Sequence, residues 1–129
     1  MITFIGDVHG KFEIYLALIN VSNIISIQVG DMGLGFGKNW YPSKIDGNHW
    51  FIRGNHDNPE ACRKHPNYLG DFGIKTIDNL KIFFMSGAFS IDKDWRIPEV
   101  SWWEEEELSY KVLSDQVIPL FKKEKPEIV

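Results

Sequence analysis

The sequence contains little cysteine, no excess of basic residues and no long hydrophobic run. Its single cysteine, Cys62, excludes a disulfide within the chain and a zinc site of four thiolates, and it favours a reducing compartment. The net charge of −4 argues against a broad nucleic-acid-binding surface. No apolar run approaches the length of a membrane span, and residues 1–4 lack a basic leader. We therefore expect a cytoplasmic protein that does not contact a membrane.

The residues that are present are typical of a globular protein. The chain has 129 residues, of which 43% are hydrophobic and 25% are charged. These values separate it from disordered and coiled-coil sequences. The length corresponds to one domain over residues 1–129 with a core of its own.

The first half of the chain alternates apolar strands with polar loops. Three short apolar runs, each closed by glycine, predict strands at residues 2–5, 24–29 and 49–52. Apolar residues at helical spacing over 12–19 predict a helix after the first strand, with its end at residues 20–23. This order predicts an α/β fold that begins with a parallel sheet.

The second half begins with a helix and a hairpin. Residues 58–60, Asn-Pro-Glu, are typical of a helix start. Residues 74–77 and 80–85 flank an Asp-Asn pair and predict a two-residue hairpin. A helix with basic residues in its last turn is predicted over residues 114–125.

The chemically active residue types follow the first three strands. The loops are Gly6-Asp7-Val8-His9-Gly10, Gly30-Asp31 and Gly54-Asn55-His56-Asp57. Ligands of open α/β sheets bind beyond the carboxyl ends of the strands, so we expect the three loops to converge. Their carboxylates, imidazole and amide oxygen suit manganese, iron or zinc, with positions left for water and substrate. Each loop alone is also explained as a polar turn, but three such strand ends together favour a common function.

In this order and spacing, the three loops resemble the calcineurin-like metallophosphoesterase superfamily over residues 2–60. The resemblance implies a metallophosphoesterase-like β-sandwich flanked by helices, with the C-terminal part shortened. The stretch SGAFSIDKDWR at residues 86–96 and the WWE at 102–104 are also similar to small phage and bacterial phosphoesterases.

The resemblance implies two divalent metal ions, which would be manganese, iron or zinc. Asp7, His9 and Asp31 would hold the first ion, and Asp31 would bridge to the second. Asn55 would bind the second ion and contact the phosphate. Two such ions clamp a phosphate and generate a hydroxide nucleophile.

The resemblance also implies the catalytic and substrate-binding side chains. His56 would protonate the leaving oxygen, with Asp57 orienting its ring. Arg53 matches an arginine that grips the phosphate in the protein-phosphatase branch, a task that suits a bidentate guanidinium. Arg96, in the charged loop of residues 92–96, could neutralise the phosphate as well.

Two departures from the family pattern bear on function. The segment after Asp31 lacks the arginine of the protein-phosphatase branch, so a nucleotide is as plausible a substrate as a phosphoprotein. The family also supplies two further histidines to the second ion. His49 opens the third strand, away from Asn55, and His65 is expected to end a helix beside its negative pole. We therefore expect an incomplete second site, unless a homo-oligomer or a partner chain completes it.

Two functions follow from these expectations. The first is a metal-dependent phosphoesterase that hydrolyses a phosphomonoester or phosphodiester through a metal-bound hydroxide. The alternative is a catalytically weak or inactive shortened relative that serves as a metal-binding, phosphate-binding or protein-interaction module. The acidic run at 104–107 is expected to be a solvated helix start, and the tryptophans nearby to pack on the sheet edge rather than stack on a nucleobase.

Overall fold

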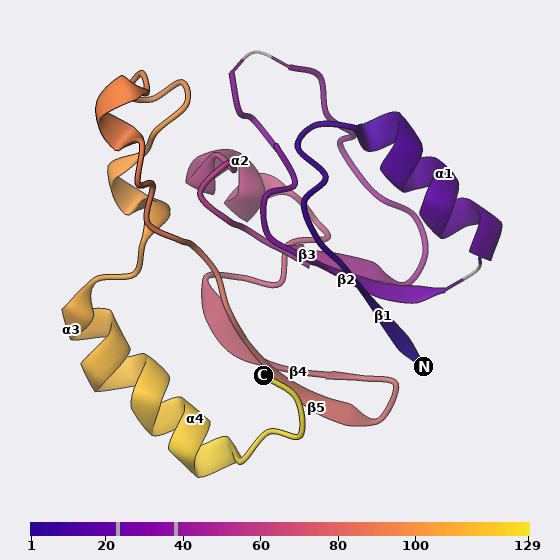
Figure 1. The fold of residues 1–129 in the computed structure, drawn as a ribbon. Helices are drawn as coiled ribbons and strands as arrows, with labels where there is room; N and C mark the ends of the chain where they lie inside the picture. The colour runs from indigo at the N-terminus through magenta and orange to yellow at the C-terminus, as the bar shows by residue number, and fades with distance from the viewer. Residues whose placement is uncertain (23, 38) are drawn as a thin grey trace.

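The computed structural model describes residues 1–22, 24–37 and 39–129 (Figure 1). Three parallel strands form the first sheet, in the order β1 (Ile2–Ile5), β2 (Ile25–Val29) and β3 (His49–Ile52). Helix α1 (Phe12–Ser22) makes the crossover between β1 and β2. The parallel start predicted from the sequence is confirmed, while Asn23, at the predicted end of the helix, lies outside the described residues.

Helices cover one face of this sheet. Phe12, Tyr15 and Ile19 of α1 recur at helical spacing and are buried against residues of the loop after β2 and of β3. Helix α2 (Pro59–Lys64) adds Cys62 to the same cluster. The buried thiol behaves as a small hydrophobic side chain, and burial raises its pKa.

A hairpin covers the opposite face of the sheet. Strands β4 (Phe72–Ile77) and β5 (Leu80–Met85) pair in antiparallel register around Asp78 and Asn79. Both turn residues have positive φ, 51° and 64°, which is the conformation of a two-residue hairpin loop. The predicted hairpin is therefore confirmed, and β4 begins two residues earlier than predicted.

A second apolar cluster joins the two sheets. Ile27 of β2 packs with Ile77 and Ile82 of the hairpin, and all three are buried. Ile128 forms a parallel bridge to Ile82 beside β5. Figure 1 shows the resulting layers, with α1 and α2 above the first sheet and the hairpin below it. The α/β class and the arrangement of sheets flanked by helices are as expected.

The C-terminal helix begins earlier than the sequence predicts. α3 (Tyr110–Val112), a π-helical turn (Leu113–Val117) and α4 (Ile118–Glu124) follow one another without a break. The Ser109 hydroxyl caps the start by accepting a hydrogen bond from Val112 N at 3.3 Å. This cap explains the shift from residue 114 to residue 110. None of the helices in the described ranges is both long and apolar enough to cross a membrane.

Candidate functional site

The loops after β1 and β2 are joined through their backbones. Val8 N and His9 N both donate to the Asp31 carbonyl, at 3.1 and 2.9 Å, and Gly10 N donates to the Met32 carbonyl at 2.9 Å. A side chain at Gly33 would place its Cβ 2.4 Å from Gly10 N. The two loops therefore lie too close together for any residue but glycine at this position.

Three of the predicted metal ligands have backbone conformations that are rare outside glycine. The φ angles of Asp7, His9 and Asp31 are 21°, 46° and 56°. Such conformations are costly for residues with a side chain, and they cluster at functional sites. The strain is concentrated where the sequence predicts the first metal ion.

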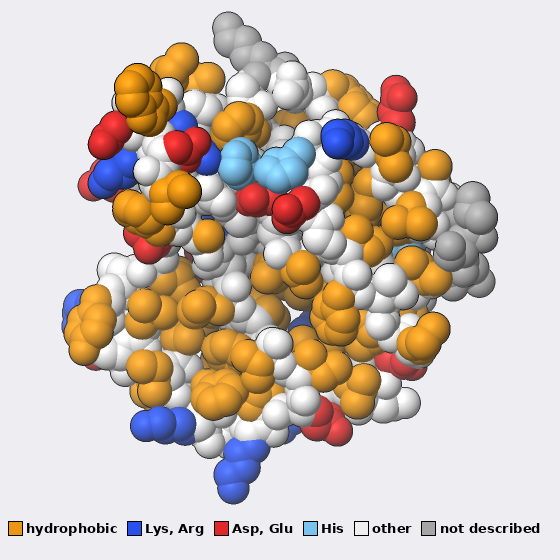
Figure 2. Space-filling view, viewed as in Figure 1, with side chains coloured by type: hydrophobic (Ala, Val, Ile, Leu, Met, Phe, Trp, Pro, Cys, Tyr) orange, Lys and Arg blue, Asp and Glu red, His pale blue; other side chains and the backbone are white. Residues whose placement is uncertain are grey.

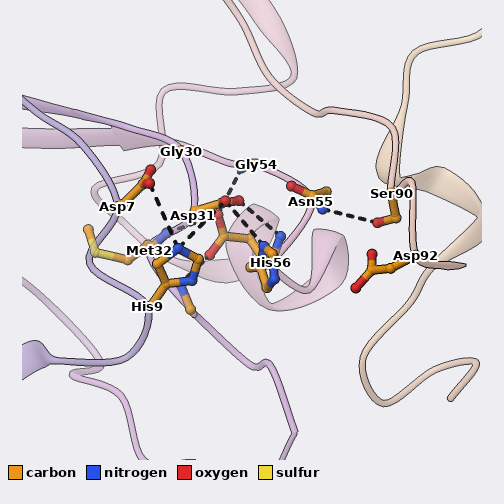
Figure 3. Close-up of polar contacts among 12 residues, drawn as sticks. Asp7, His9, Gly30, Asp31, Met32, Gly54, Asn55, His56, Ser90 and Asp92 are labelled. Atoms are coloured by element: carbon orange, nitrogen blue, oxygen red, sulfur yellow. Dashed lines mark hydrogen bonds and ion pairs between the residues drawn. The ribbon is translucent and has the colours of Figure 1, made fainter. Parts of the chain in front are cut away.

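The structure brings these three side chains together. His9 Nε2 lies 3.9 Å from Asp7 Oδ2 and 3.9 Å from Asp31 Oδ2 (Figure 3). Ligand atoms of His9, Asp31 and His56 also lie within 4.8 Å of one another. His9, flanked by the carboxylates of Asp7 and Asp31, therefore belongs to a donor set that fits a divalent transition metal ion.

The cluster is open to solvent on one side. The Asp7 side chain is 78% exposed and that of His9 is 41% exposed, whereas Asp31 is only 20% exposed. Figure 2 shows two histidine side chains and adjacent acidic side chains together on one face of the molecule. A pocket of about 190 Å³ lies beside the two imidazoles, lined also by Gly10, Gly33, Phe36 and Asn39. Water and a small ligand can therefore reach the cluster.

His56 is held on several sides. Asp31 accepts from the His56 backbone N–H at 3.1 Å and lies 3.1 Å from Nδ1 of its ring. The His9 ring meets it edge-on with centroids 4.7 Å apart, and Phe36 lies against it at 5.1 Å. Arg96 Nη2 lies 3.2 Å from the remaining ring nitrogen, Nε2. The imidazole is thus fixed between a carboxylate and a guanidinium.

The family comparison agrees with this geometry. A model of the calcineurin-like phosphoesterase family matches residues 1–129. The chain belongs to this family. No curated protein and no solved structure matches it significantly. Membership supports a metal-dependent phosphoesterase at the level of the family, and a hydrolase as its enzyme class.

The prediction that Asp57 orients His56 is wrong for this calcineurin-like phosphoesterase. The Asp57 side chain is fully buried and accepts backbone N–H bonds from the loop after β2 and from its own loop after β3. The donors are Met32 at 3.2 Å, Gly33 at 2.7 Å, Leu34 at 3.0 Å and Gly54 at 2.8 Å. Burial raises the pKa of Asp57, and these four bonds act in the opposite direction. Asp57 therefore joins the loops after β2 and β3, and Asp31 bonds His56 instead.

The prediction that Arg53 grips a phosphate is also wrong. Its side chain has no exposed surface, because it lies between the loop before β4 and the acidic turn at residues 104–106. Nε bonds Asp71 at 3.2 Å and Nη1 donates to the Glu106 carbonyl at 2.8 Å. Arg53 is therefore a structural cation in this protein.

Arg96 lies at the site, where the sequence places a substrate-binding residue. Nη1 donates to the Asn55 carbonyl at 3.0 Å, and the guanidinium lies 5.7 Å from the centre of the Phe36 ring. Asp92 forms an ion pair with it at 2.8 Å. Of the two arginines predicted to contact phosphate, Arg96 is the one beside His56.

The other two histidines of the chain lie away from His9, Asp31 and His56, as expected. His49 Nδ1 pairs with the Ser26 hydroxyl at 2.8 Å, and His65 Nε2 with the Pro42 carbonyl at 2.9 Å. Burial lowers the pKa of both rings. His65 caps the C-terminus of α2, as expected, and its buried ring favours the neutral form.

Sequence reasoning missed two residues that support Asn55. Its Nδ2 donates to Ser90 Oγ at 3.1 Å (Figure 3). Ser90 in turn donates to Glu106. Glu106 is buried, so the acidic run at 104–107 is not wholly solvated as expected. Nothing in the run distinguishes Glu106 from its neighbours, since the difference arises from the turn that aims it inward.

Proposed function

We propose that the chain hydrolyses a phosphomonoester or phosphodiester at the cluster of Asp7, His9, Asp31 and Asn55. The observation that carries the proposal is the convergence of His9, Asp31 and His56 at the carboxyl ends of three parallel strands. This is where ligands bind in such sheets, and the side chains are those of a metal-assisted hydrolase.

The residues divide into two groups around one phosphate. Asp7, His9 and Asp31 would hold a first divalent ion, with Asp31 and Asn55 available to a second. Such ions, with manganese as our first choice, supply positive charge to the phosphoryl oxygens and lower the pKa of the attacking water. In this proposal the ester lies between the exposed side of Asp7 and His9 and the His56–Arg96 pair, an arrangement supported by the distances among these side chains.

His56 is proposed as the general acid. Asp31 accepts a hydrogen bond from Nδ1, which fixes the ring and leaves Nε2 to carry the proton for the leaving oxygen. Arg96 donates to Nε2 in the free protein. A phosphate oxygen is a stronger acceptor for a guanidinium than an imidazole is, so we propose that Arg96 moves to the substrate phosphate. Nε2 then takes up a proton from solvent and delivers it to the leaving oxygen.

A phosphate ester of a nucleotide or of a phosphoprotein is the proposed substrate class. A second candidate function is binding of metal or phosphate without turnover. If turnover does occur, we propose that a homo-oligomer or a partner chain completes the site. This candidate is favoured by His49 and His65, which bond Ser26 and Pro42 away from the site. Among the described residues, His9 and His56 are then the imidazoles that remain beside a second ion.

Hydrolysis of an aryl phosphate and of its bis-aryl diester, with added manganese, tests the proposal. We expect a rate above buffer that requires the metal and disappears in Asp31→Asn. Asp46→Asn is the matched control, because Asp46 is an exposed carboxylate that pairs with Lys44. Normal manganese binding without hydrolysis of either ester would reject the enzyme in favour of the binding module.

A further inference from the structure

The side-chain amide of Asn55 presents two different chemical groups, and only one of them can ligate a cation. Its oxygen is an acceptor, and its nitrogen carries two donor hydrogens. Nδ2 donates to Ser90 Oγ at 3.1 Å. Figure 3 shows this nitrogen turned toward Ser90 and the amide oxygen on the side of Asp31. The orientation of Asn55 therefore decides whether the site gains a ligand or a repelling donor.

Glu106 determines the direction of this hydrogen-bond chain. Its carboxylate accepts from Ser90 Oγ at 2.5 Å and from Ser90 N at 2.8 Å. Ser90 is fully buried and Glu106 is 3% exposed, so the chain is shielded from water. Because the carboxylate only accepts, the single hydroxyl hydrogen of Ser90 is committed to it. Ser90 Oγ can then only accept from Asn55, which requires the Asn55 nitrogen to face it.

Glu106 is itself anchored by its backbone. Its carbonyl accepts from Arg53 Nη1 at 2.8 Å, and Arg53 immediately follows β3. A side chain at Gly87 would place its Cβ 2.2 Å from the same carbonyl. The backbone of residues 86–90 and the turn at Glu106 are thus in direct contact, which holds the carboxylate beside Ser90.

We propose that Ser90 and Glu106 are positioning residues that keep the Asn55 amide oxygen directed toward a divalent cation. This inference rests on the proposed function only in taking Asn55 as a ligand of that cation. Without Ser90, either face of the amide can turn toward the site. An amide turned the other way directs N–H groups at the cation, which repel it instead of ligating it.

A manganese titration of the full chain tests the proposal without reference to hydrolysis. We expect Ser90→Ala and Glu106→Gln to lower the affinity for the manganese ion that Asn55 ligates by about tenfold to a hundredfold. Ser86→Ala is the matched control, because Ser86 is also buried and bonds the Gly70 carbonyl at 2.7 Å rather than Asn55. Its manganese affinity is expected to equal that of the wild type.

Two further variants separate positioning from general damage to the fold. In an Asn55→Ala background, Ser90→Ala should cause no additional loss of affinity, because its effect passes through Asn55. Ser90→Thr retains the hydroxyl and should restore affinity. Circular dichroism shows which variants fold. If Ser90→Ala does not fold, the manganese affinity of Glu106→Gln still tests the proposal.

Three results would overturn the proposal. They are equal affinity in Ser90→Ala and Ser86→Ala, an additive loss in the Asn55→Ala background, and a manganese affinity unchanged by Asn55→Ala itself. Absence of ester hydrolysis with these affinity changes intact would reject the proposed catalysis and leave the positioning role standing.

Discussion

The loops after β1, β2 and β3 differ from the later segment at residues 86–106 in how they contribute to the same site. The loops supply the predicted ligands, partly exposed and in strained backbone conformations. The later segment supplies Ser90 and Glu106, which are buried, and Arg96, whose side chain is only 6% exposed. The loops after β1, β2 and β3 therefore present chemical groups to solvent, and residues 86–106 orient those groups from within the protein.

The largest effect should come from the proton donor in the first region. His56→Asn is expected to lower the rate of ester hydrolysis by about 10²- to 10⁴-fold, because the leaving oxygen loses its general acid. Manganese occupancy should remain intact, since Asp7, His9 and Asp31 are untouched. Steady-state kinetics and a metal titration measure the two effects separately. A retained rate would assign protonation of the leaving oxygen to another group.

The next effect concerns stability, at the residue that joins two of the loops. Asp57→Asn should lower the free energy of unfolding by about 2–3 kcal/mol, because an amide cannot replace a carboxylate that accepts four backbone N–H bonds. Urea denaturation measures the change, with exposed Asp46→Asn as its control. A variant as stable as the wild type would show that the four bonds contribute little.

The two arginines allow the comparison to be tested within one residue type. Arg96→Ala should lower kcat/KM by about tenfold to a hundredfold, the value of one or two charge-assisted hydrogen bonds to phosphate. Arg53→Ala should instead lower the melting temperature, because it removes a buried guanidinium and breaks its partly buried ion pair with Asp71. A kinetic defect in folded Arg53→Ala as large as that of Arg96→Ala would restore Arg53 as a phosphate ligand.

The smallest effect is a pH dependence of stability from a buried histidine outside both regions. Burial lowers the folded-state pKa of His65 below its ordinary value of 6.5. Below about pH 6.5 the unfolded chain therefore binds a proton that the folded chain does not, so stability falls as the pH decreases toward the folded pKa. Above that window the contribution is constant. The free energy of unfolding, measured between pH 8 and pH 5, should decline less steeply in His65→Gln than in the wild type.

Most of the first region could be predicted from sequence alone. The strands β1 and β3 begin and end at the predicted residues, because apolar runs closed by glycine are a local signal. The convergence of Asp7, His9 and Asp31 also follows, since parallel strands place their following loops at one edge of the sheet.

The roles of neighbouring residues in one loop could not be predicted in this way. Arg53, Asn55, His56 and Asp57 are nearly contiguous, yet two of their side chains are buried in the protein interior and two reach the site. A change of backbone direction at each residue decides this, and it depends on contacts with loops distant in sequence. Glu106 differs from its acidic neighbours for the same reason.

The sequence by itself determined the α/β order, the parallel start and the three ligand-bearing loops, because these depend on local apolar patterns and on the direction of strands. Only the tertiary structure decided that Asp57 and Arg53 are structural, and that Ser90 and Glu106 stand behind Asn55. Those assignments rest mainly on hydrogen bonds between residues 16 to 53 positions apart. Such bonds form when packing removes polar groups from water, because each buried donor or acceptor then needs a partner within the protein.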